Sequence, residues 1–259
     1  MNILQEIAER TKLRIEEQKK ILPLEKLIDM TQHNENKVFP FEEALKTQDV
    51  AFICEVKKAS PSKGVIAENF PYVDIAKDYE QAGAAAISVL TEPFWFMGAD
   101  SYLKEIANAV SIPLLRKDFT VDSYMIYEAK LLGASAVLLI CSILDNDTLA
   151  EYINIAHNLG LSVLVETHNE DEVANALSSG ARIIGVNNRN LKTFEIDMNL
   201  SGRLRKLVSP NVLFVAESGI SSSKDVADMR EIGADAVLIG ESIMKSADKK
   251  AEIARLKGL

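Results

Sequence analysis

Eight short apolar runs recur from residue 51 onward, and their number and even spacing constrain the fold more than any other feature. The runs are AFICEV (51–56), AAISVL (85–90), IPLLR (112–116), AVLLIC (136–141), SVLVE (162–166), IIGVN (183–187), VLFVAE (212–217) and AVLIG (236–240). Stretches of helical periodicity, such as residues 74–82 and 147–159, lie between them. Apolar runs that alternate with helices predict parallel strands.

A glycine–alanine pair precedes every second run and adds a fourfold repeat. The glycines are Gly83, Gly133, Gly180 and Gly233, at intervals of 50, 47 and 53 residues. Glycine suits the end of a helix, where the backbone turns left-handed. Residues 51–259 allow about 26 residues for each strand–helix unit, which predicts an α/β protein with a (β/α)8 TIM barrel. The alternative is an open doubly wound sheet, which usually has fewer strands and no such repeat.

Residues 1–50 have a different pattern. Apolar residues recur at helical spacing in two stretches, which contain Ile3, Leu4 and Ile7, and later Leu24, Leu27 and Ile28. A further short helix is predicted around residues 42–46. This segment is too short for a domain of its own. We therefore expect one domain, with an N-terminal helical extension over residues 1–50 packed on a barrel over residues 51–259.

The formal charge of −9 makes nucleic acid or an anionic membrane an unsuitable partner for the surface as a whole. An anionic small molecule would need local cations. No apolar run reaches the roughly 20 residues of a membrane span, and the charged first 20 residues lack a secretory signal pattern. Cys54 and Cys141 cannot build a disulfide framework. We expect a cytoplasmic monomer or weak homodimer without a metal site.

Polar residues end most of the predicted strands, where a barrel of this kind carries its site. Because strand side chains alternate between faces, Glu55 and Lys57 share one face, as do Asn187 and Arg189. The remaining polar or aromatic strand ends are Lys117, Phe119, Glu166, Glu217 and Ser218. Any one of them could be a solvated strand end. Solvation explains six such ends together poorly, so we expect these groups to pair across the mouth of the barrel.

The last two strand ends predict an anion site. Gly219 and Gly240 would allow a ligand to approach the backbone closely. Residues 240–244 resemble the start of a short helix, whose free N–H groups near Glu241 could bind phosphate, and loops seven and eight are the usual phosphate position in this fold. The alternative is that both glycines only form turns.

The motifs EVKKASPSKG, LRKDF, VLVETH, GVNNRNL, AESGI and LIGESIM resemble those of the indole-3-glycerol phosphate synthase family, in order and with its spacing, from about residue 51 to residue 244. The resemblance implies a carboxy-lyase of tryptophan biosynthesis. Its substrate would be 1-(2-carboxyphenylamino)-1-deoxyribulose 5-phosphate, which it would convert to indole-3-glycerol phosphate with loss of carbon dioxide and water. No cofactor is implied, because restored aromaticity drives the decarboxylation.

The same resemblance implies roles for individual residues. Lys117 would protonate the substrate ketone, and Glu166 and Lys57 would share the acid and base work of the later dehydration, in an order left open. Further implied groups are Glu55 beside a lysine, Asn187 on the reacting oxygens, Glu217 and Ser218 in the polar ring, and Arg189 and Ser60 on the substrate carboxylate or the first loop. Phe96, Phe119 and Leu238 would hold the benzene ring.

Two other functions remain as alternatives. Phosphoribosylanthranilate isomerases use a cysteine after strand one and an aspartate after strand six, but Cys54 has the outward parity and strand six ends in NNRN. A non-catalytic barrel that senses a phosphorylated metabolite would not need Lys117, Glu166 and Glu55 together. His168 could be a base, but a loop residue beside a helix cap is the simpler interpretation.

Overall fold

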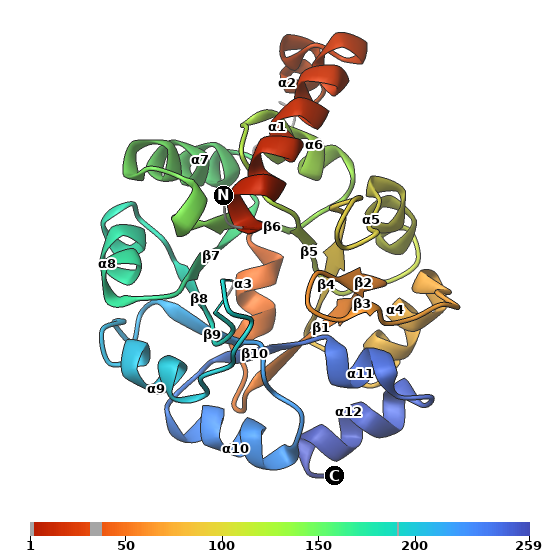
Figure 1. Cartoon of the computed structure of the whole chain (residues 1–259), viewed down its shortest axis with the longest axis vertical. Helices are drawn as coiled ribbons and strands as arrows, with labels where there is room; N and C mark the ends of the chain where they lie inside the picture. Colours follow the sequence, from red (N-terminus) through yellow and green to blue (C-terminus); the bar gives the residue numbers. More distant parts are fainter. Residues whose placement is uncertain (1–2, 32–37, 191) are drawn as a thin grey trace.

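Eight parallel strands close into a barrel in the computed structural model, which describes residues 3–31, 38–190 and 192–259 (Figure 1). The strands are β1 (Ala51–Val56), β4 (Ala86–Leu90), β5 (Leu114–Lys117), β6 (Ala136–Ile140), β7 (Ser162–Thr167), β8 (Ile183–Asn187), β9 (Leu213–Glu217) and β10 (Ala236–Ile239). Strand β1 pairs with β4 on one side and with β10 on the other, so the sheet has no open edge. The predicted barrel is confirmed, and the open sheet is excluded.

Helices alternate with the strands around the outside of the barrel (Figure 1). They are α4 (Tyr72–Gln81), α5 (Asp100–Ala107), α6 (Tyr124–Leu131), α7 (Asn146–Asn158), α8 (Glu170–Ser178), α9 (Asn199–Arg205), α10 (Ser223–Glu231) and α12 (Lys249–Lys257), with a 3-10 turn η1 (Cys141–Ile143) after β6. The glycines of the four glycine–alanine pairs follow α4, α6, α8 and α10 with φ between 75° and 90°. Their predicted role in ending helices is therefore confirmed.

Strand parity separates two apolar layers. On β1, Phe52, Cys54 and Val56 face outward and join the cluster between sheet and helices, whereas Ala51 and Ile53 join the cluster inside the barrel. Glu55 lies at the top of the inward row and is buried. The inward parity of each strand therefore leads from an apolar plug to a polar mouth.

The N-terminal segment forms α1 (Ile3–Ile21), α2 (Leu24–Thr31) and α3 (Pro40–Leu45). Helix α3 packs against β4 and β7, and its Phe41 and Leu45 are fully buried in the interior cluster. Leu4 and Ile7 of α1 belong to the same cluster and line the pocket at the mouth. The far end of α1 projects beyond the barrel with α2 (Figure 1).

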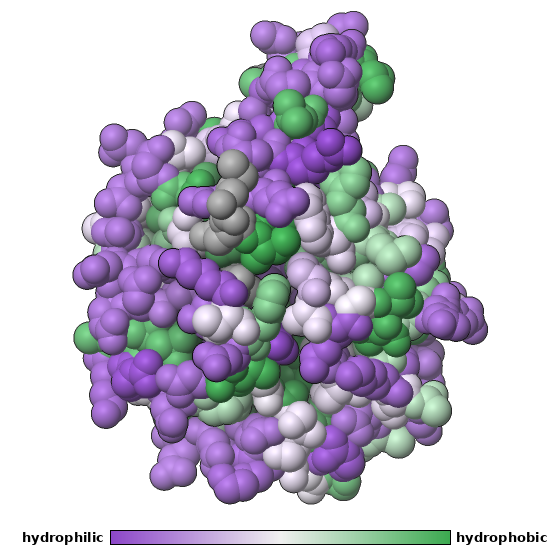
Figure 2. Space-filling model, in the orientation of Figure 1, coloured by the Kyte–Doolittle hydropathy of each residue, from purple (hydrophilic) through white to green (hydrophobic). Residues whose placement is uncertain are grey.

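A two-stranded hairpin follows β1, with β2 (Ala59–Ser60) antiparallel to β3 (Gly64–Val65). It carries Ser60, Ser62 and Lys63 to the rim of the pocket. Hydrophilic side chains cover most of this face of the molecule, and apolar side chains form separate patches near its centre and toward its sides (Figure 2). Within the described residues, no helix is both long and apolar enough to cross a membrane.

Candidate active site

A pocket of about 490 Å³ opens at the carboxyl ends of the barrel strands. All fifteen residues that the sequence nominated line this pocket: Glu55, Lys57, Ser60, Phe96, Lys117, Phe119, Glu166, Asn187, Arg189, Glu217, Ser218, Gly219, Leu238, Gly240 and Glu241. Their common location follows from strand parity, because the charged residues continue the inward rows of their strands. The structure thus brings together side chains from seven of the eight strand ends and loops.

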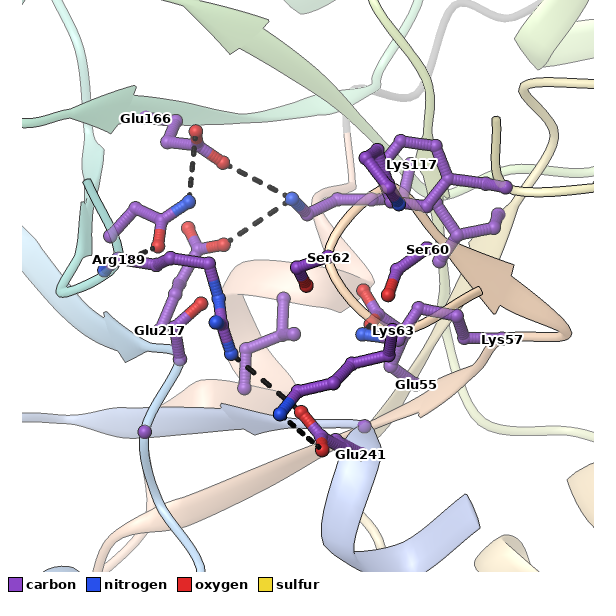
Figure 3. Close-up of a pocket in the computed structure, with 18 of the residues that line it drawn as sticks. Glu55, Lys57, Ser60, Ser62, Lys63, Lys117, Glu166, Arg189, Glu217 and Glu241 are labelled. Atoms are coloured by element: carbon purple, nitrogen blue, oxygen red, sulfur yellow. Dashed lines mark hydrogen bonds and ion pairs between the residues drawn. The ribbon is translucent and has the colours of Figure 1, made fainter. Parts of the chain in front are cut away.

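Lys117 lies at the centre of the polar groups. Its Nζ is 3.1 Å from Oε2 of Glu166 and 3.4 Å from Oε2 of Glu217 (Figure 3). Burial opposes the charge on this lysine, but Glu166, Glu217 and Glu55 outweigh burial and raise the pKa of Lys117. The surrounding carboxylates therefore keep Lys117 in its charged ammonium form.

Glu55 and Lys57 form a second pair on β1 and the residues after it. Their Oε1 and Nζ atoms are 2.6 Å apart, and Ser88 donates to Oε2 of Glu55 over 3.4 Å. Gly240 packs directly on this pair, because a Cβ there would lie 2.6 Å from Oε1 of Glu55 and 3.1 Å from Nζ of Lys57. Gly240 is thus required by the Glu55–Lys57 pair as well as by any ligand.

Glu166 and Glu217 are both buried, but the pKa of Glu166 is lowered and the pKa of Glu217 is raised. Burial would raise the pKa of Glu166, but Lys117 and His168 lower it well below the usual range. Burial raises the pKa of Glu217 to about 7, against the attraction of Lys117 and with further repulsion from Glu166 and Glu55. Oε1 of Glu217 is buried and has no hydrogen-bond partner among the described residues. Glu217 is therefore the carboxyl group of this cluster that takes up a proton most readily.

Asn187 and Arg189 organise the segment after β8. Asn187 donates from Nδ2 to Oε1 of Glu166 over 3.2 Å and accepts from the backbone N–H of Arg189 over 3.0 Å. The Arg189 guanidinium donates to the carbonyl of Phe194 and reaches Oε2 of Glu241 at 3.6 Å (Figure 3). Arg189 therefore points toward the side of the pocket that follows β10.

The part of the pocket formed by the segments after β9 and β10 has the backbone geometry of an anion site. Ser218 and Gly219 both have left-handed backbone, with φ of 67° and 85°, a conformation that non-glycine residues adopt at a cost and that is concentrated at functional sites. Helix α11 (Glu241–Lys245) begins directly after Gly240. Lys63 and Ser242 also line this end, and the buried hydroxyl of Ser242 has no hydrogen-bond partner among the described residues.

The Glu241 side chain lies among the cations of this end. Its carboxylate is 2.7 Å from Lys245 and 3.6 Å from each of Lys63 and Arg189. Hydrogen bonding and attraction to Lys245, with further attraction to Lys63 and Arg189, lower the pKa of Glu241 despite partial burial. The sequence suggested only the backbone of Glu241 for anion binding. Its side chain pairs with Lys63, Arg189 and Lys245, which all line this end of the pocket.

Apolar side chains line the opposite side of the pocket. The rings of Phe96 and Phe119 lie 6.1 Å apart, and Leu238 is buried beside them in the interior cluster. Helix α1 adds Leu4 and Ile7 to this wall. The sequence predicted an extension packed on the barrel but did not place these two residues at the site, because helical periodicity identifies a buried face without its contact.

His168 does not line the pocket but contacts Glu166 from the segment directly after β7. Its Nε2 is 3.4 Å from Oε1 of Glu166, and its Nδ1 is 3.2 Å from Oε2 of Glu172. The predicted position beside a helix cap holds, since Asn169 caps α8, but the contact with Glu166 was missed. Cys54 faces the helices, as its parity indicated, and burial raises the pKa of its thiol to about 12. The described residues contain no cluster of metal-ligating side chains.

Comparisons with known proteins point to one family over nearly the whole length of the chain. The family model for indole-3-glycerol phosphate synthase matches residues 4–256. The chain is 59% identical to the indole-3-glycerol phosphate synthase of Ruminiclostridium cellulolyticum, over 99% of both chains, and 50% identical to that of Lachnoclostridium phytofermentans, also over 99% of both.

Among solved structures, the fold resembles 3-hexulose-6-phosphate synthase from Salmonella typhimurium with a TM-score of 0.65. That match has 19% identity and covers 81% of this chain and 97% of the other, so it supports the barrel alone. The sequence relatives carry the assignment further, and this chain belongs to the indole-3-glycerol phosphate synthase family.

Proposed function

We propose that this pocket closes the indole ring of 1-(2-carboxyphenylamino)-1-deoxyribulose 5-phosphate, with loss of carbon dioxide and water, and releases indole-3-glycerol phosphate for tryptophan biosynthesis. Family membership along the whole chain carries the proposal. The placement of Lys117 between Glu166 and Glu217 supports it, because the reaction needs an acid and a base close to one carbon–oxygen bond.

In the first step, the ring carbon that bears the carboxylate bonds to the ketone carbon of the substrate. The ketone electron pair moves to its oxygen, which takes a proton, while positive charge develops in the ring. Lys117 supplies this proton, and its ammonium stabilises the developing charge more than it stabilises the neutral ketone. Carbon dioxide then leaves, and the electrons of the broken bond restore the aromatic ring.

In the second step, the new hydroxyl leaves as water and a carbon–carbon double bond forms. An acid must protonate the hydroxyl, and a base must take a proton from the methylene carbon beside the ring nitrogen. We assign the acid to Lys57, which is paired with Glu55, and the base to Glu166. Glu166 becomes a stronger base once Lys117 has given up its proton, because a nearby positive charge is then lost.

The remaining residues bind the substrate. The backbone N–H groups at Gly219, Gly240 and Glu241 hold the phosphate, with Lys63 and Ser242 beside them. Asn187 donates to the reacting oxygens, and Glu217 and Ser218 complete the polar ring. Arg189 and Ser60 hold the carboxylate or support the first loop. Phe96, Phe119 and Leu238 contact the benzene ring.

The local charge of the pocket fits an anionic substrate on an acidic protein. The chain carries −9 overall, yet Lys57, Lys63, Lys117 and Arg189 all line one pocket. These cations offset the general repulsion of a substrate that carries both a carboxylate and a phosphate. We also propose a cytoplasmic location and a monomer or weak homodimer, which two free cysteines and an acidic surface support.

Turnover tests this function directly. The purified chain should convert the substrate to a product with indole absorbance and fluorescence, and a substrate labelled with ¹³C in its carboxylate should release labelled carbon dioxide at the same rate. Glu166→Gln should abolish the indole signal and retain substrate binding, and it should release no more than about one equivalent of labelled carbon dioxide per site, because decarboxylation precedes the step that needs this base. Binding of the substrate by the unsubstituted chain with neither signal would favour a metabolite sensor and reject the enzyme.

A further inference from the structure

His168 lies between two carboxylates. Its Nε2 faces Oε1 of Glu166 at 3.4 Å, and its Nδ1 faces Oε2 of Glu172 at 3.2 Å. A neutral imidazole carries a proton on one ring nitrogen only, so it could donate to one carboxylate and would present a lone pair to the other. A protonated imidazole places its positive charge beside both, with a hydrogen bond to Glu172 and an ion-pair contact to Glu166. The two contacts together therefore favour the imidazolium form.

Glu172 is held firmly on the outer side of this imidazole. Its Oε2 accepts from the backbone N–H of His168 over 2.8 Å, and its Oε1 accepts from Nδ2 of Asn169 over 2.9 Å. Glu172 lies in the first turn of α8, where free N–H groups favour negative charge. The ring of His168 is thus anchored by a fixed carboxylate that does not contact the pocket.

The inner side of the imidazole meets a carboxylate with several other partners. Oε2 of Glu166 contacts Nζ of Lys117 at 3.1 Å, and Oε1 accepts from Asn187 over 3.2 Å. His168 approaches the same Oε1 from the direction of β7. Glu166 therefore has one oxygen on the central lysine, while the other accepts a hydrogen bond from Asn187 and lies 3.4 Å from Nε2 of His168, which is buried and makes no hydrogen bond among the described residues.

We propose that His168, protonated and anchored by Glu172, is a positioning residue that orients the Glu166 carboxylate and keeps it ionised. The inference rests on the proposed role of Glu166 as the base of the dehydration. Lys117 cannot perform this task throughout the reaction, because it gives up its proton in the first step. His168 remains charged after that transfer, so one cation stays beside Glu166 when the base is needed.

The charged groups around the pair are consistent with this assignment. Burial opposes the charge on His168, but the two carboxylates beside its ring, those of Glu166 and Glu172, raise its pKa to about 10. Cys141 of η1 also packs here, and its Sγ lies 3.6 Å from the carbonyl of Glu172. Burial and the two carboxylates raise the pKa of that thiol to about 12, so it stays neutral. On the pocket side, Lys117, Glu217 and Glu55 complete the surroundings of Glu166.

The charge on His168 can be measured in the unsubstituted protein. The chain has three histidines, His33, His157 and His168, so nuclear magnetic resonance of ¹⁵N-histidine-labelled enzyme resolves few rings, and the spectrum of His168→Gln identifies the relevant one. A histidine with the ordinary pKa of about 6.5 is neutral at pH 8. We expect the His168 ring to be doubly protonated at pH 8, and a neutral ring there would overturn the proposal.

Variants test whether this charge acts through Glu166. His168→Gln keeps an amide donor but removes the charge, and we expect kcat to fall roughly 10- to 100-fold through loss of orientation. KM should stay within about threefold, because the phosphate contacts are intact. The pKa of Glu166 should rise without this cation, so the acidic limb of the kcat–pH profile should move to higher pH. Loss of folding alone would lower activity without moving that limb.

Glu172 supplies a second variant, and Glu170 supplies its matched control. Glu172→Gln should lower kcat in the unsubstituted background and have no further effect in His168→Gln, because Glu172 acts only through His168. Glu170→Gln makes the same change in the same turn at an exposed position, and it should leave kcat and the pH profile unchanged. An additive effect of Glu172→Gln in both backgrounds would reject the proposed linkage.

Glu166→Gln separates the two levels of inference. If Glu166→Gln retains turnover, the base assignment and the inference that depends on it both fail. If Glu166→Gln is inactive while His168→Gln has the kcat and pH profile of the unsubstituted enzyme, only the role of His168 fails.

Discussion

Arg14 of α1 donates to Oδ2 of Asp118 over 2.9 Å, although the two residues lie 104 positions apart. Asp118 directly follows Lys117, and its side chain is completely buried. The same Oδ2 accepts from the Thr91 hydroxyl over 2.7 Å, while Oδ1 accepts from the backbone N–H of Phe119 over 2.8 Å. The N-terminal extension is therefore tied by an ion pair to the strand end that carries the central lysine.

Arg14→Met should lower the free energy of unfolding by about 3 kcal/mol, because it leaves the buried Asp118 carboxylate without its closest cation. Denaturant unfolding measures the change. Lys12→Met on the same helix is the control, since Lys12 forms a surface pair with the exposed Glu9, and it should cost no more than about 1 kcal/mol. Equal losses in the two variants would show that the Arg14–Asp118 pair contributes nothing beyond a surface pair.

Most of the barrel could be predicted from the sequence because its signals are local. Each apolar run corresponds to a strand, with ends that differ by no more than two residues. The glycines of the glycine–alanine pairs have positive φ for the expected reason, as at Gly83 and Gly180. Strand parity then places Glu55 and Lys57 at the mouth and Cys54 against the helices, because an exact period of two decides which face a side chain joins.

The contacts between distant segments could not be predicted in this way. Neither the Arg14–Asp118 pair nor the placement of Leu4 and Ile7 at the pocket has a sequence signal, because both depend on the angle at which α1 crosses the mouth. His168 had a usable signal, since it shares parity with Glu166. Its second partner, Glu172, is fixed by the turn into α8, and that geometry appears only in three dimensions.

Cys54→Ala and Cys141→Ala should each keep turnover within about tenfold, which corresponds to about 1.4 kcal/mol in the activation free energy. Both thiols stay protonated, because burial raises the pKa of each to about 12. Cys54 is fully buried in the outer apolar cluster, so its loss should cost roughly 1 to 2 kcal/mol of stability through the cavity left behind. Steady-state kinetics and urea unfolding check the two effects, and an inactive but folded Cys54 variant would revive the isomerase reading.

The anion site makes a prediction about Glu241. A crystal grown from sulfate should hold the anion near Gly219, Gly240 and Glu241. Glu241→Gln should strengthen sulfate binding by up to roughly tenfold, about 1.4 kcal/mol, because it frees Lys63 and Arg189 from a competing carboxylate. Calorimetric titration measures this, with Glu231→Gln on α10 as the exposed control. Weaker binding in Glu241→Gln would contradict competition between the carboxylate and the anion.

Gly219→Val tests whether the backbone at the same site binds the phosphate of the substrate. The residue has a φ of 85°, and an added Cβ would lie 2.5 Å from Sδ of Met198 and 2.7 Å from Cγ2 of Ile196. We expect KM to rise at least tenfold, about 1.4 kcal/mol, as the loop shifts away from the phosphate. Kinetics with the substrate check this, and circular dichroism confirms that the variant is folded. An unchanged KM would move the phosphate site elsewhere.

Glu217 predicts a specific pH dependence of stability. Its pKa is about 7 in the folded protein, above the ordinary value of 4.5, so the folded state binds the proton more tightly than the unfolded state. This group therefore destabilises the fold progressively as the pH rises from about 4.5 to 7. Urea unfolding of Glu217→Gln should show a stability advantage over the unsubstituted protein that grows through this range. A constant difference, or the same trend in exposed Glu231→Gln, would contradict the raised pKa.

Lys117→Met is the most direct test of the mechanism. It removes the ammonium that contacts Glu166 and Glu217 and keeps most of the stem volume. The fold should survive, because Glu217 can take up a proton and His168 still faces Glu166. Removal of a positioned acid that also stabilises charge should lower kcat by roughly 10² to 10⁴, while KM changes far less because the phosphate contacts remain.

Two comparisons make this result specific to proton transfer. Lys117→Arg restores the charge but should not restore full activity, because the larger planar guanidinium cannot take the place of a compact ammonium between Glu166 and Glu217. Lys77→Met on α4 removes an exposed lysine and should leave kcat unchanged. Rapid-mixing measurements of a single turnover locate the effect, since loss of the first proton donor should slow the carbon–carbon bond formation and not the later dehydration. A near-normal kcat in Lys117→Met would transfer the acid role to Lys57, the other lysine that is paired with a glutamate at the mouth.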